Sequence, residues 1–480
     1  MTRGRLPSPE GDPAADVPLR LVTLTRELPG SPDLGLLAAR ARDAGWDGAV
    51  VERTVPEAVS VAAVGRALEL VTDSTGTYLE VDRQRQRVGP ATGGIGLGRA
   101  WRELAASALV LDDPGMPATG LVAIGGFAFS PERLPQGPWA GFPGALLRVP
   151  TLAVVRTGGR CFSVAAMLAP ADVSPAGLRR RLGRAARLVR LAAPPERGSG
   201  LPARIRATPP SGSRERWETA VGLAAAALRQ GRAEKVVLAR AVTARADRPL
   251  SLARVVGALR AAYPGAHTFA LGGADGTCLV GSSPELLISR HGDRVVSRPL
   301  AGSTGRDPSP ARDRALARAL RADPKERAEH RAVVEDIRER LLPVVRRIAV
   351  ADQPTVLRLP TIQHLATTIR ARLAGPHPPS ALELAALLHP TPAVGGRPRE
   401  AALGLLAEIE DLERGWYTGA IGWVDGRGDG ELAIALRCGL LVEDGALCFA
   451  GCGIMPGSDP AREWAETELK LQPVLRALAS

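Results

Sequence analysis

The chain has 480 residues, of which 45% are hydrophobic and 23% charged, an ordinary balance for a soluble globular enzyme. This length is enough to bury a large core. We find no uninterrupted apolar run of membrane-spanning length and no signal peptide, so we expect a cytoplasmic protein without a membrane partner. The five cysteines include no CxxC pair, which argues against a disulfide framework or a zinc site and favours reduced thiols.

The formal charge of +12 raises the possibility of a nucleic-acid partner. The charge is spread over the whole chain, however, and aromatic residues make up only 3%, too few for base-stacking platforms. The densest basic run, Arg179 to Arg190, alternates with Leu and Val at helical spacing, so a solvated helix face explains it. We therefore expect no nucleic-acid partner, although a non-catalytic basic binding protein remains the competing class.

Lysine usage is unusually sparse. Of the 62 basic residues only three are lysines, namely Lys235, Lys325 and Lys470. Lysine can lose its proton and act as a base or as a compact charge, whereas arginine stays protonated. A chain that uses arginine almost everywhere should keep lysine where arginine cannot replace it.

Composition divides the chain into three parts. Residues 1–20 are polar and proline-rich and are predicted to be a loose tail. Residues 21–205 are predicted to form a variable N-terminal part of the fold, and residues 206–476 a core with denser motifs. A stretch rich in Pro, Gly and Ser, residues 193–213, is a plausible linker between these parts.

Two strands are predicted in the N-terminal part. Gly125–Ser130 is edged by glycines and followed by Pro131, and Val154–Val164 is a second apolar run.

The core opens with a predicted helix, Trp217–Gln230, and a strand, Lys235–Arg240. Lys235 stands at the entry of this apolar strand, where desolvation would favour a general base. The alternative is a lysine that snorkels from a strand edge. Three short antiparallel strands follow, and Glu285 comes directly after a proline turn between two of them. Such a loop-held carboxylate suits a general acid, but it is also a common capping residue.

A helix is predicted after the cap Asp323 and Pro324. On it Glu329 lies in line with Val333, Ile337 and Leu341 at steps of four residues. A carboxylate that faces inward must be paired or bound to a metal, because an unpaired buried charge is costly.

The remaining segments predict an α+β protein with strands in runs and long helices between them. Arg298–Arg306 is a polar loop able to offer backbone amides to an anion. Thr361–Ile369 is a further strand that contains His364. Three segments are predicted to be neighbouring strands of one antiparallel sheet, with Arg437 pointing from one of them: Gly415–Val424, Leu432–Cys438 and Leu447–Ala450.

The C-terminal stretch Gly451–Lys470 begins with a glycine-rich turn and continues as a helix capped by Ser458 or Asp459. Glu463, Glu466 and Lys470 fall on one face of this helix. Two carboxylates one turn apart beside a lysine could hold a divalent cation and an anionic ligand together. The alternative is an exposed helix with a single Glu466–Lys470 ion pair.

Together these motifs resemble the chorismate-utilising enzymes, the family of isochorismate, salicylate, anthranilate and aminodeoxychorismate synthases. The resemblance covers residues 214–475 in the family's order, with a weaker match at GGFAFSPE (Gly125–Glu132). The matching stretches are EKVVLAR (Glu234–Arg240), SSPELL (Ser282–Leu287), RPLAGSTGR (Arg298–Arg306), KERAEH (Lys325–His330), QHLATTI (Gln363–Ile369), HPTPAVGG (His389–Gly396), GWYTGAIGWVDGRGDGE (Gly415–Glu431), ALRC (Ala435–Cys438) and GCGIMPGSDPAREWAETELK (Gly451–Lys470).

The resemblance implies one large α+β unit in which two antiparallel sheets pack together with helices outside. It implies Mg²⁺ bound by Glu329 and Glu466, with Glu463 beside it, and chorismate as the substrate. The residues implied to bind the substrate are Gly302, His364, Thr367, Tyr417, Arg437, Gly451, Gly453 and Lys470.

Two positions indicate the branch of the family. Lys235 stands where water-using members carry their general base, and Ala301 stands where aminodeoxychorismate synthases carry a nucleophilic lysine. The resemblance therefore implies an isochorismate synthase, an isomerase in which Lys235 activates water at C2 and Glu285 protonates the departing C4 hydroxyl. Salicylate synthase, which then eliminates pyruvate, is the alternative. The water-using reading implies no glutaminase partner, and we expect a monomer.

Overall fold

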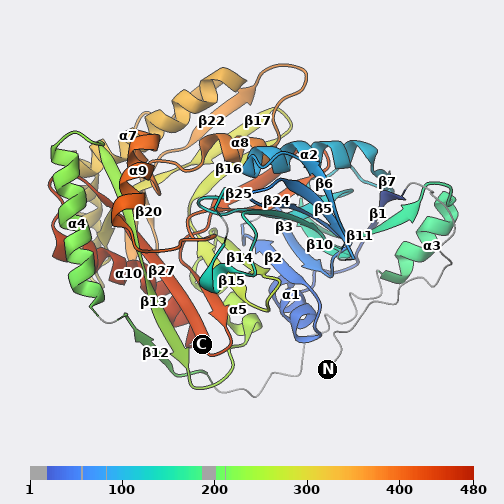
Figure 1. Ribbon diagram of the computed structural model, residues 1–480, viewed down its shortest axis with the longest axis horizontal. Coiled ribbons are helices and arrows are strands. Elements are labelled where there is room, and N and C mark those ends of the chain that lie inside the picture. The colour runs from blue at the N-terminus through green and yellow to red at the C-terminus, as the bar shows by residue number, and fades with distance from the viewer. Residues whose placement is uncertain (1–18, 56–57, 83, 134, 186–201, 211) are drawn as a thin grey trace.

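The structure is a computed structural model that describes residues 19–55, 58–82, 84–133, 135–185, 202–210 and 212–480. Within them, two large and mainly antiparallel sheets pack together, and helices lie on the outside (Figure 1). The predicted α+β fold class is thereby confirmed. No helix in the described part of the chain has both the length and the apolar composition needed to cross a membrane. The five cysteines are buried and free.

The first sheet contains strands from both halves of the chain. Its strands are β1 (Leu19–Glu27), β2 (Gly48–Glu52), β3 (Ser60–Val64), β7 (Leu109–Leu111), β10 (Leu152–Thr157), β11 (Arg160–Pro170), β12 (Ile205–Thr208), β13 (Lys235–Ala246), β14 (His267–Gly272), β15 (Cys278–Ser283), β23 (Gly396–Arg397), β26 (Cys438–Val442) and β27 (Gly445–Ile454). They follow the order β12-β13-β27-β26-β15-β14-β2-β3-β10-β11-β1-β7, and β23 pairs with β13. Strands of the N-terminal part and strands of the core therefore belong to the same sheet.

The second sheet is built in the same mixed way. Its strands are β4 (Leu68–Thr72), β5 (Thr77–Val81), β6 (Gln84–Gly89), β8 (Val122–Phe127), β9 (Ala145–Val149), β16 (Leu286–His291), β17 (Arg294–Arg298), β19 (Val345–Val350), β22 (Ile369–Leu373), β24 (Ala420–Asp425) and β25 (Gly430–Ile434). Their order is β19-β22-β17-β16-β25-β24-β8-β9-β4-β5-β6. A small third sheet has the order β18-β21-β20 and consists of β18 (Leu300–Gly305), β20 (Thr355–Arg358) and β21 (Ile362–Ala366).

The helices enclose these sheets from outside. They are α1 (Leu34–Asp43), α2 (Gly93–Ser107), α3 (Pro175–Ala185), α4 (Ser213–Arg229), α5 (Leu252–Ala262), α6 (Pro310–Ala322), α7 (Pro324–Leu341), α8 (Ala381–Leu388), α9 (Arg399–Ile409) and α10 (Pro460–Leu478). In Figure 1, α2 and α8 lie on the opposite side of the molecule from α1 and α5. α1, α5 and α10 pack on the first sheet, and α2 and α8 on the second.

Between the two sheets lies a buried apolar layer that holds them together. Val51 of β2 and Phe449 of β27 come from the first sheet, and Ile124 of β8 and Trp423 of β24 from the second. Because successive side chains of a strand point to opposite faces, each strand gives this layer every second residue.

The structure differs from the predicted strand at Val154–Val164. Gly158 and Gly159, with φ of +55° and +73°, form a turn that separates β10 from β11. Glycine reaches these left-handed conformations without steric cost, so two paired strands replace one long strand.

The three C-terminal segments predicted to be neighbours of one sheet are divided between the two sheets. β24 and β25 belong to the second sheet, whereas β26 and β27 belong to the first. The chain crosses between the sheets just before β26, and Arg437 has φ of +50° at this crossing. Arg437 therefore lies at the seam of the sandwich rather than on a strand, because a continuous strand would require extended backbone there.

Three other predictions meet the structure only in part. The predicted loop Arg298–Arg306 is largely strand β18. Of the predicted tail, residues 1–18 lie outside the described residues, and Leu19 and Arg20 already belong to β1. Much of the predicted linker also lies outside them, and Ile205–Thr208 forms β12.

Candidate active site

A cavity of about 480 Å³ lies where the first large sheet, the small sheet, α7 and α10 meet, and several loops complete its wall. Most of the predicted site residues line it, although they are far apart in the sequence. The predicted residues in its wall are Glu285, Gly302, Glu329, His364, Tyr417, Arg437, Gly451, Gly453, Glu463, Glu466 and Lys470. Lys235 reaches this wall from behind, through its contact with Glu329.

Lys235 begins β13 and is almost fully buried, with 2% of its side chain exposed. Its Nζ lies 2.7 Å from Oε1 of Glu329, which α7 brings in from the other side. A Cβ on Gly453 would stand 2.5 Å from this Oε1 and 2.8 Å from Cε of Lys235. Glycine at position 453 is therefore what lets the lysine and the carboxylate meet.

Glu285 lies in the short connection between β15 and β16 and is 3% exposed. Burial raises the pKa of its carboxyl to about 7, although the Leu300 amide and the charge of Lys235 oppose this shift. A carboxyl with this pKa is partly protonated at neutral pH, as a general acid requires.

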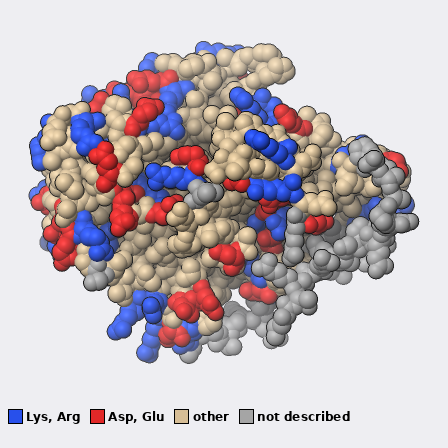
Figure 2. Space-filling model, in the orientation of Figure 1, with Lys and Arg blue, Asp and Glu red and all other residues tan. Residues whose placement is uncertain are grey.

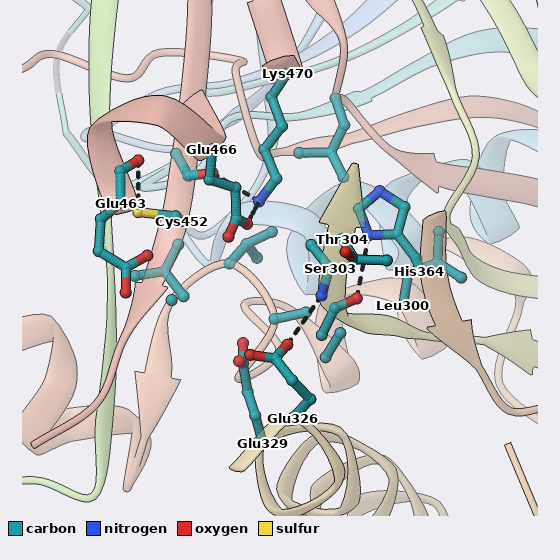
Figure 3. A pocket seen from close by; sticks show the side chains of 18 of the residues that line it. Leu300, Ser303, Thr304, Glu326, Glu329, His364, Cys452, Glu463, Glu466 and Lys470 are labelled. Atoms are coloured by element: carbon teal, nitrogen blue, oxygen red, sulfur yellow. Dashed lines mark hydrogen bonds and ion pairs between the residues drawn. The ribbon is translucent and has the colours of Figure 1, made fainter. Parts of the chain in front are cut away.

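The helix α10 presents its predicted acidic face to the cavity. Asp459 caps the helix by accepting a hydrogen bond from the Arg462 amide, which selects one of the two predicted caps. Figure 3 shows Glu466 and Lys470 side by side on this helix. Lys470 Nζ lies 2.5 Å from Oε1 of Glu466 and donates to the Gly451 carbonyl at 3.0 Å.

The structure adds a carboxylate that the sequence reasoning left without a role. Glu326 lines the cavity beside Glu329 (Figure 3), and its Oε2 accepts a hydrogen bond from the Ser303 amide at 2.9 Å. Burial, followed by the charge of Glu329, raises the pKa of Glu326 to about 7. The signal was present in the sequence, because residues 326 and 329 share a helix face at a spacing of three.

Arg437 supplies a buried positive charge to the cavity. It is 6% exposed, its Nε has no hydrogen-bond partner, and its Nη2 donates to Nε2 of His364 at 2.9 Å. His364 Nδ1 in turn lies 3.0 Å from the Ser303 hydroxyl. Burial and the charge of Arg437 hold the pKa of His364 well below its usual range, so the neutral ring orients the guanidinium. A buried guanidinium with a free donor is suited to a carboxylate ligand.

The glycines of the site allow neighbouring side chains to come close to the backbone. A Cβ on Gly451 would stand 3.2 Å from the Tyr417 hydroxyl, and Tyr417 stacks on Phe449 with ring centroids 5.2 Å apart. Gly302 has φ of +78°, which favours glycine, and lies against Glu326. The anion-binding role predicted for these backbone amides stays a prediction.

Thr367 does not line the cavity, in contrast to the expectation that it binds substrate. It follows the end of β21, is 3% exposed, and its Oγ1 lies 2.6 Å from Nε2 of His330 on α7. This contact links the segment after β21 to α7, and the substrate-binding role of Thr367 stays a prediction.

The carboxylates in the cavity wall form a candidate cation site. Within the described residues, no three His, Cys, Asp or Glu side chains already stand together as a metal-binding group. Burial, followed by the charge of Glu466, raises the pKa of Glu463. Mg²⁺ binds through one or two carboxylates and keeps several waters, so Glu329 and Glu466 with Glu463 beside them fit this ion.

Comparison with known proteins identifies the family. The family model for chorismate-binding enzymes matches residues 95–479. A salicylate biosynthesis isochorismate synthase from Pseudomonas aeruginosa is 37% identical over 381 residues, which cover 79% of this chain and 78% of the relative. A putative isochorismate synthase, MenF, from Mycobacterium tuberculosis is 44% identical over 256 residues, or 52% of this chain and 68% of the relative.

Solved structures share the fold. The menaquinone-specific isochorismate synthase MenF from Escherichia coli matches with a TM-score of 0.74 and 24% identity, covering 97% of this chain and 96% of that one. A putative 2,3-dihydroxybenzoate-specific isochorismate synthase, DhbC, from Bacillus anthracis matches with a TM-score of 0.68 and 25% identity, covering 90% and 96%. With the family model spanning the cavity residues and the same sandwich in these structures, the chain belongs to the chorismate-binding enzymes.

Proposed function

We propose that this protein is an isochorismate synthase that converts chorismate to isochorismate by adding water at C2 and removing the C4 hydroxyl. One observation carries the proposal: a buried carboxyl with a pKa of about 7, Glu285, and the buried guanidinium of Arg437 line one cavity, and the buried Lys235 lies directly behind its wall in contact with the lining residue Glu329. The relatives named as isochorismate synthases support it.

Two proton transfers make up the reaction. In its neutral form, released from the ion pair with Glu329, Lys235 takes a proton from the water whose oxygen bonds to C2, and the ring double bonds shift. Glu285 gives its proton to the C4 hydroxyl, which leaves as water. Solvent then returns both groups to their starting states, so the reaction is an isomerisation without net loss of atoms. A base and an acid kept apart by their environments allow both steps at neutral pH.

The substrate has two carboxylates, and the cavity offers a different partner for each. Arg437, held by His364, would bind the enolpyruvyl carboxylate together with Tyr417. Glu329 and Glu466, with Glu463 nearby, would hold Mg²⁺ on the ring carboxylate. When bound, Mg²⁺ would neutralise this carboxylate and withdraw electrons from the ring.

Water rather than an amine is the proposed nucleophile. Ala301 lines the cavity, so the position at which related enzymes carry a nucleophilic lysine holds only a methyl group. The chain would then need no glutaminase partner and could act alone. We propose that its product feeds menaquinone or siderophore biosynthesis; the name of one similar protein specifies menaquinone and that of another salicylate biosynthesis.

The face of the molecule that Figure 2 shows favours this function over a basic binding protein. Figure 2 shows lysine and arginine interspersed with aspartate and glutamate on the visible face. A nucleic-acid surface requires basic side chains gathered on one face or along one groove.

The test is a product analysis. Purified protein is incubated with chorismate and Mg²⁺, the products are separated, and pyruvate is assayed in the same sample. We expect isochorismate without pyruvate, and no product after EDTA. Salicylate with stoichiometric pyruvate would assign the enzyme to the salicylate synthases. Absence of turnover would contradict the proposal, and binding to nucleic acid that falls steeply with salt would support the competing class.

A further inference from the structure

Each of the three carboxylates assigned to the cation site is paired with a different lysine, and these are all the lysines of the chain. Lys235 pairs with Glu329 at 2.7 Å and Lys470 with Glu466 at 2.5 Å. Lys325, which has no role in the reaction above, has its Nζ 3.8 Å from Oε1 of Glu463.

Lys325 lies in the cavity wall at its solvent-exposed side, with 45% of its side chain exposed. It is the second residue of α7 after the cap Asp323, and a positive charge in the first turn of a helix opposes the helix dipole. Its position therefore does not serve the stability of α7. Between the described residues of α7 and α10, its pair with Glu463 is the one ion pair.

The pair with Glu463 is loose and exchangeable. A distance of 3.8 Å is at the long end for an ion pair, and the exposed ammonium retains much of its hydration. A divalent cation beside Glu463 would take over this carboxylate and repel the ammonium. Lys325 would then present to the cavity a positive charge that no carboxylate neutralises. The bound cation would at the same time make the cavity favourable for a dianionic ligand.

We propose that Lys325 is a further substrate-binding residue, which exchanges Glu463 for a carboxylate of the substrate once the divalent cation is bound. The ligand class is a small dicarboxylate, and the inference rests on the proposed function. In this arrangement Lys325 opposes cation binding in the empty site and favours substrate binding in the loaded one.

This double role gives a signature that simple damage to the site would not produce. In Lys325→Met, which keeps a long unbranched side chain but removes the charge, Mg²⁺ alone should bind about two- to fivefold more tightly, as measured by calorimetry on metal-stripped protein. The KM for chorismate should rise about tenfold, the worth of one charge-assisted hydrogen bond, with kcat changed by less than about threefold.

Three companion variants isolate the contact. Lys325→Arg keeps the charge and should hold the KM within about threefold of the wild type. Arg462→Met removes another exposed charge from the same wall and should likewise change the KM by less than about threefold, because a long-range field is screened. In a Glu463→Gln background, Lys325→Met should no longer tighten Mg²⁺ binding.

An unchanged KM in Lys325→Met, weaker Mg²⁺ binding in that variant, or an equal rise in KM for Arg462→Met would each overturn the proposal. Failure of the proposed function looks different, because the wild type itself would then not convert chorismate. Calorimetric binding of chorismate to the Mg²⁺-loaded wild type and to Lys325→Met would still test the contact in that case.

Discussion

The Nζ of Lys235 and the Oε1 of Glu329 lie 2.7 Å apart, so the proposed base and a proposed cation ligand form one buried ion pair. This pair joins β13 of the first sheet to α7, two elements far apart in the sequence. Removing either partner would leave the other charge buried without compensation. Chemistry and local stability are therefore linked at this point.

Lys235→Ala should lower kcat by about 10² to 10⁴-fold, the usual contribution of a general base. The matched variant Lys235→Arg keeps the positive charge beside Glu329 but cannot release its proton, so it should fold and remain inactive. Steady-state kinetics with circular dichroism as a folding check measures both. Turnover of Lys235→Arg within about tenfold of the wild type would exclude proton transfer by this residue.

The rate should depend on pH through Glu285. Burial raises the pKa of its carboxyl to about 7. Only the protonated carboxyl can donate a proton to the leaving hydroxyl. As pH rises above about 7 this form is lost from the free enzyme, so kcat/KM should fall about tenfold for each further pH unit. The measurement is kcat/KM for chorismate at saturating Mg²⁺ over about pH 6 to 9. Glu285→Gln should be nearly inactive at every pH, and a wild-type profile that stays flat above neutrality would assign the acid elsewhere.

Removal of the cation should stop the reaction reversibly. EDTA should abolish turnover and added Mg²⁺ restore it, and Glu329→Gln or Glu466→Gln should raise the Mg²⁺ concentration for half-maximal rate by at least about tenfold. Glu408→Gln is the control, because Glu408 is exposed and pairs with Arg232 away from the cavity. Turnover by metal-stripped enzyme in the presence of EDTA would contradict the assignment of these carboxylates to a cation site.

Gly453→Ala should inactivate the enzyme without changing any charged group. The added methyl would stand 2.5 Å from Oε1 of Glu329, so the lysine and the carboxylate must separate. Displacement of a reacting group by about 1 Å can lower the rate about 10²-fold. Gly457→Ala is a matched control in the same wall, because a Cβ there meets nothing within 4 Å. Equal activity of the two variants would show that this contact is not required.

Much of the site could be predicted because its local signals are strong. The cap Asp323, the apolar stripe Val333, Ile337 and Leu341, and the acidic face of α10 all depend on helix periodicity, which acts within a few residues. The motif resemblance then gave the set of residues that meet in the cavity.

What the sequence could not give depends on tertiary context. The crossing at Arg437 follows from which sheet each neighbouring strand joins, and no local pattern encodes that choice. Thr367 contacts His330 rather than the cavity, because the segment after β21 lies against α7. The one-to-one pairing of lysines with carboxylates requires the relative positions of β13, α7 and α10.

The first sheet also sets the order in which the protein can become active during its synthesis. Val236 of β13 pairs with Ile454 of β27, and β14 pairs with β2 from near the start of the chain. A nascent chain that lacks β27 exposes the open edge of β13 to other molecules, a hazard for aggregation. It also lacks the helix that carries Glu466 and Lys470. Partly made chains therefore lack part of the proposed site, which is complete only after β27 and α10 have joined the fold.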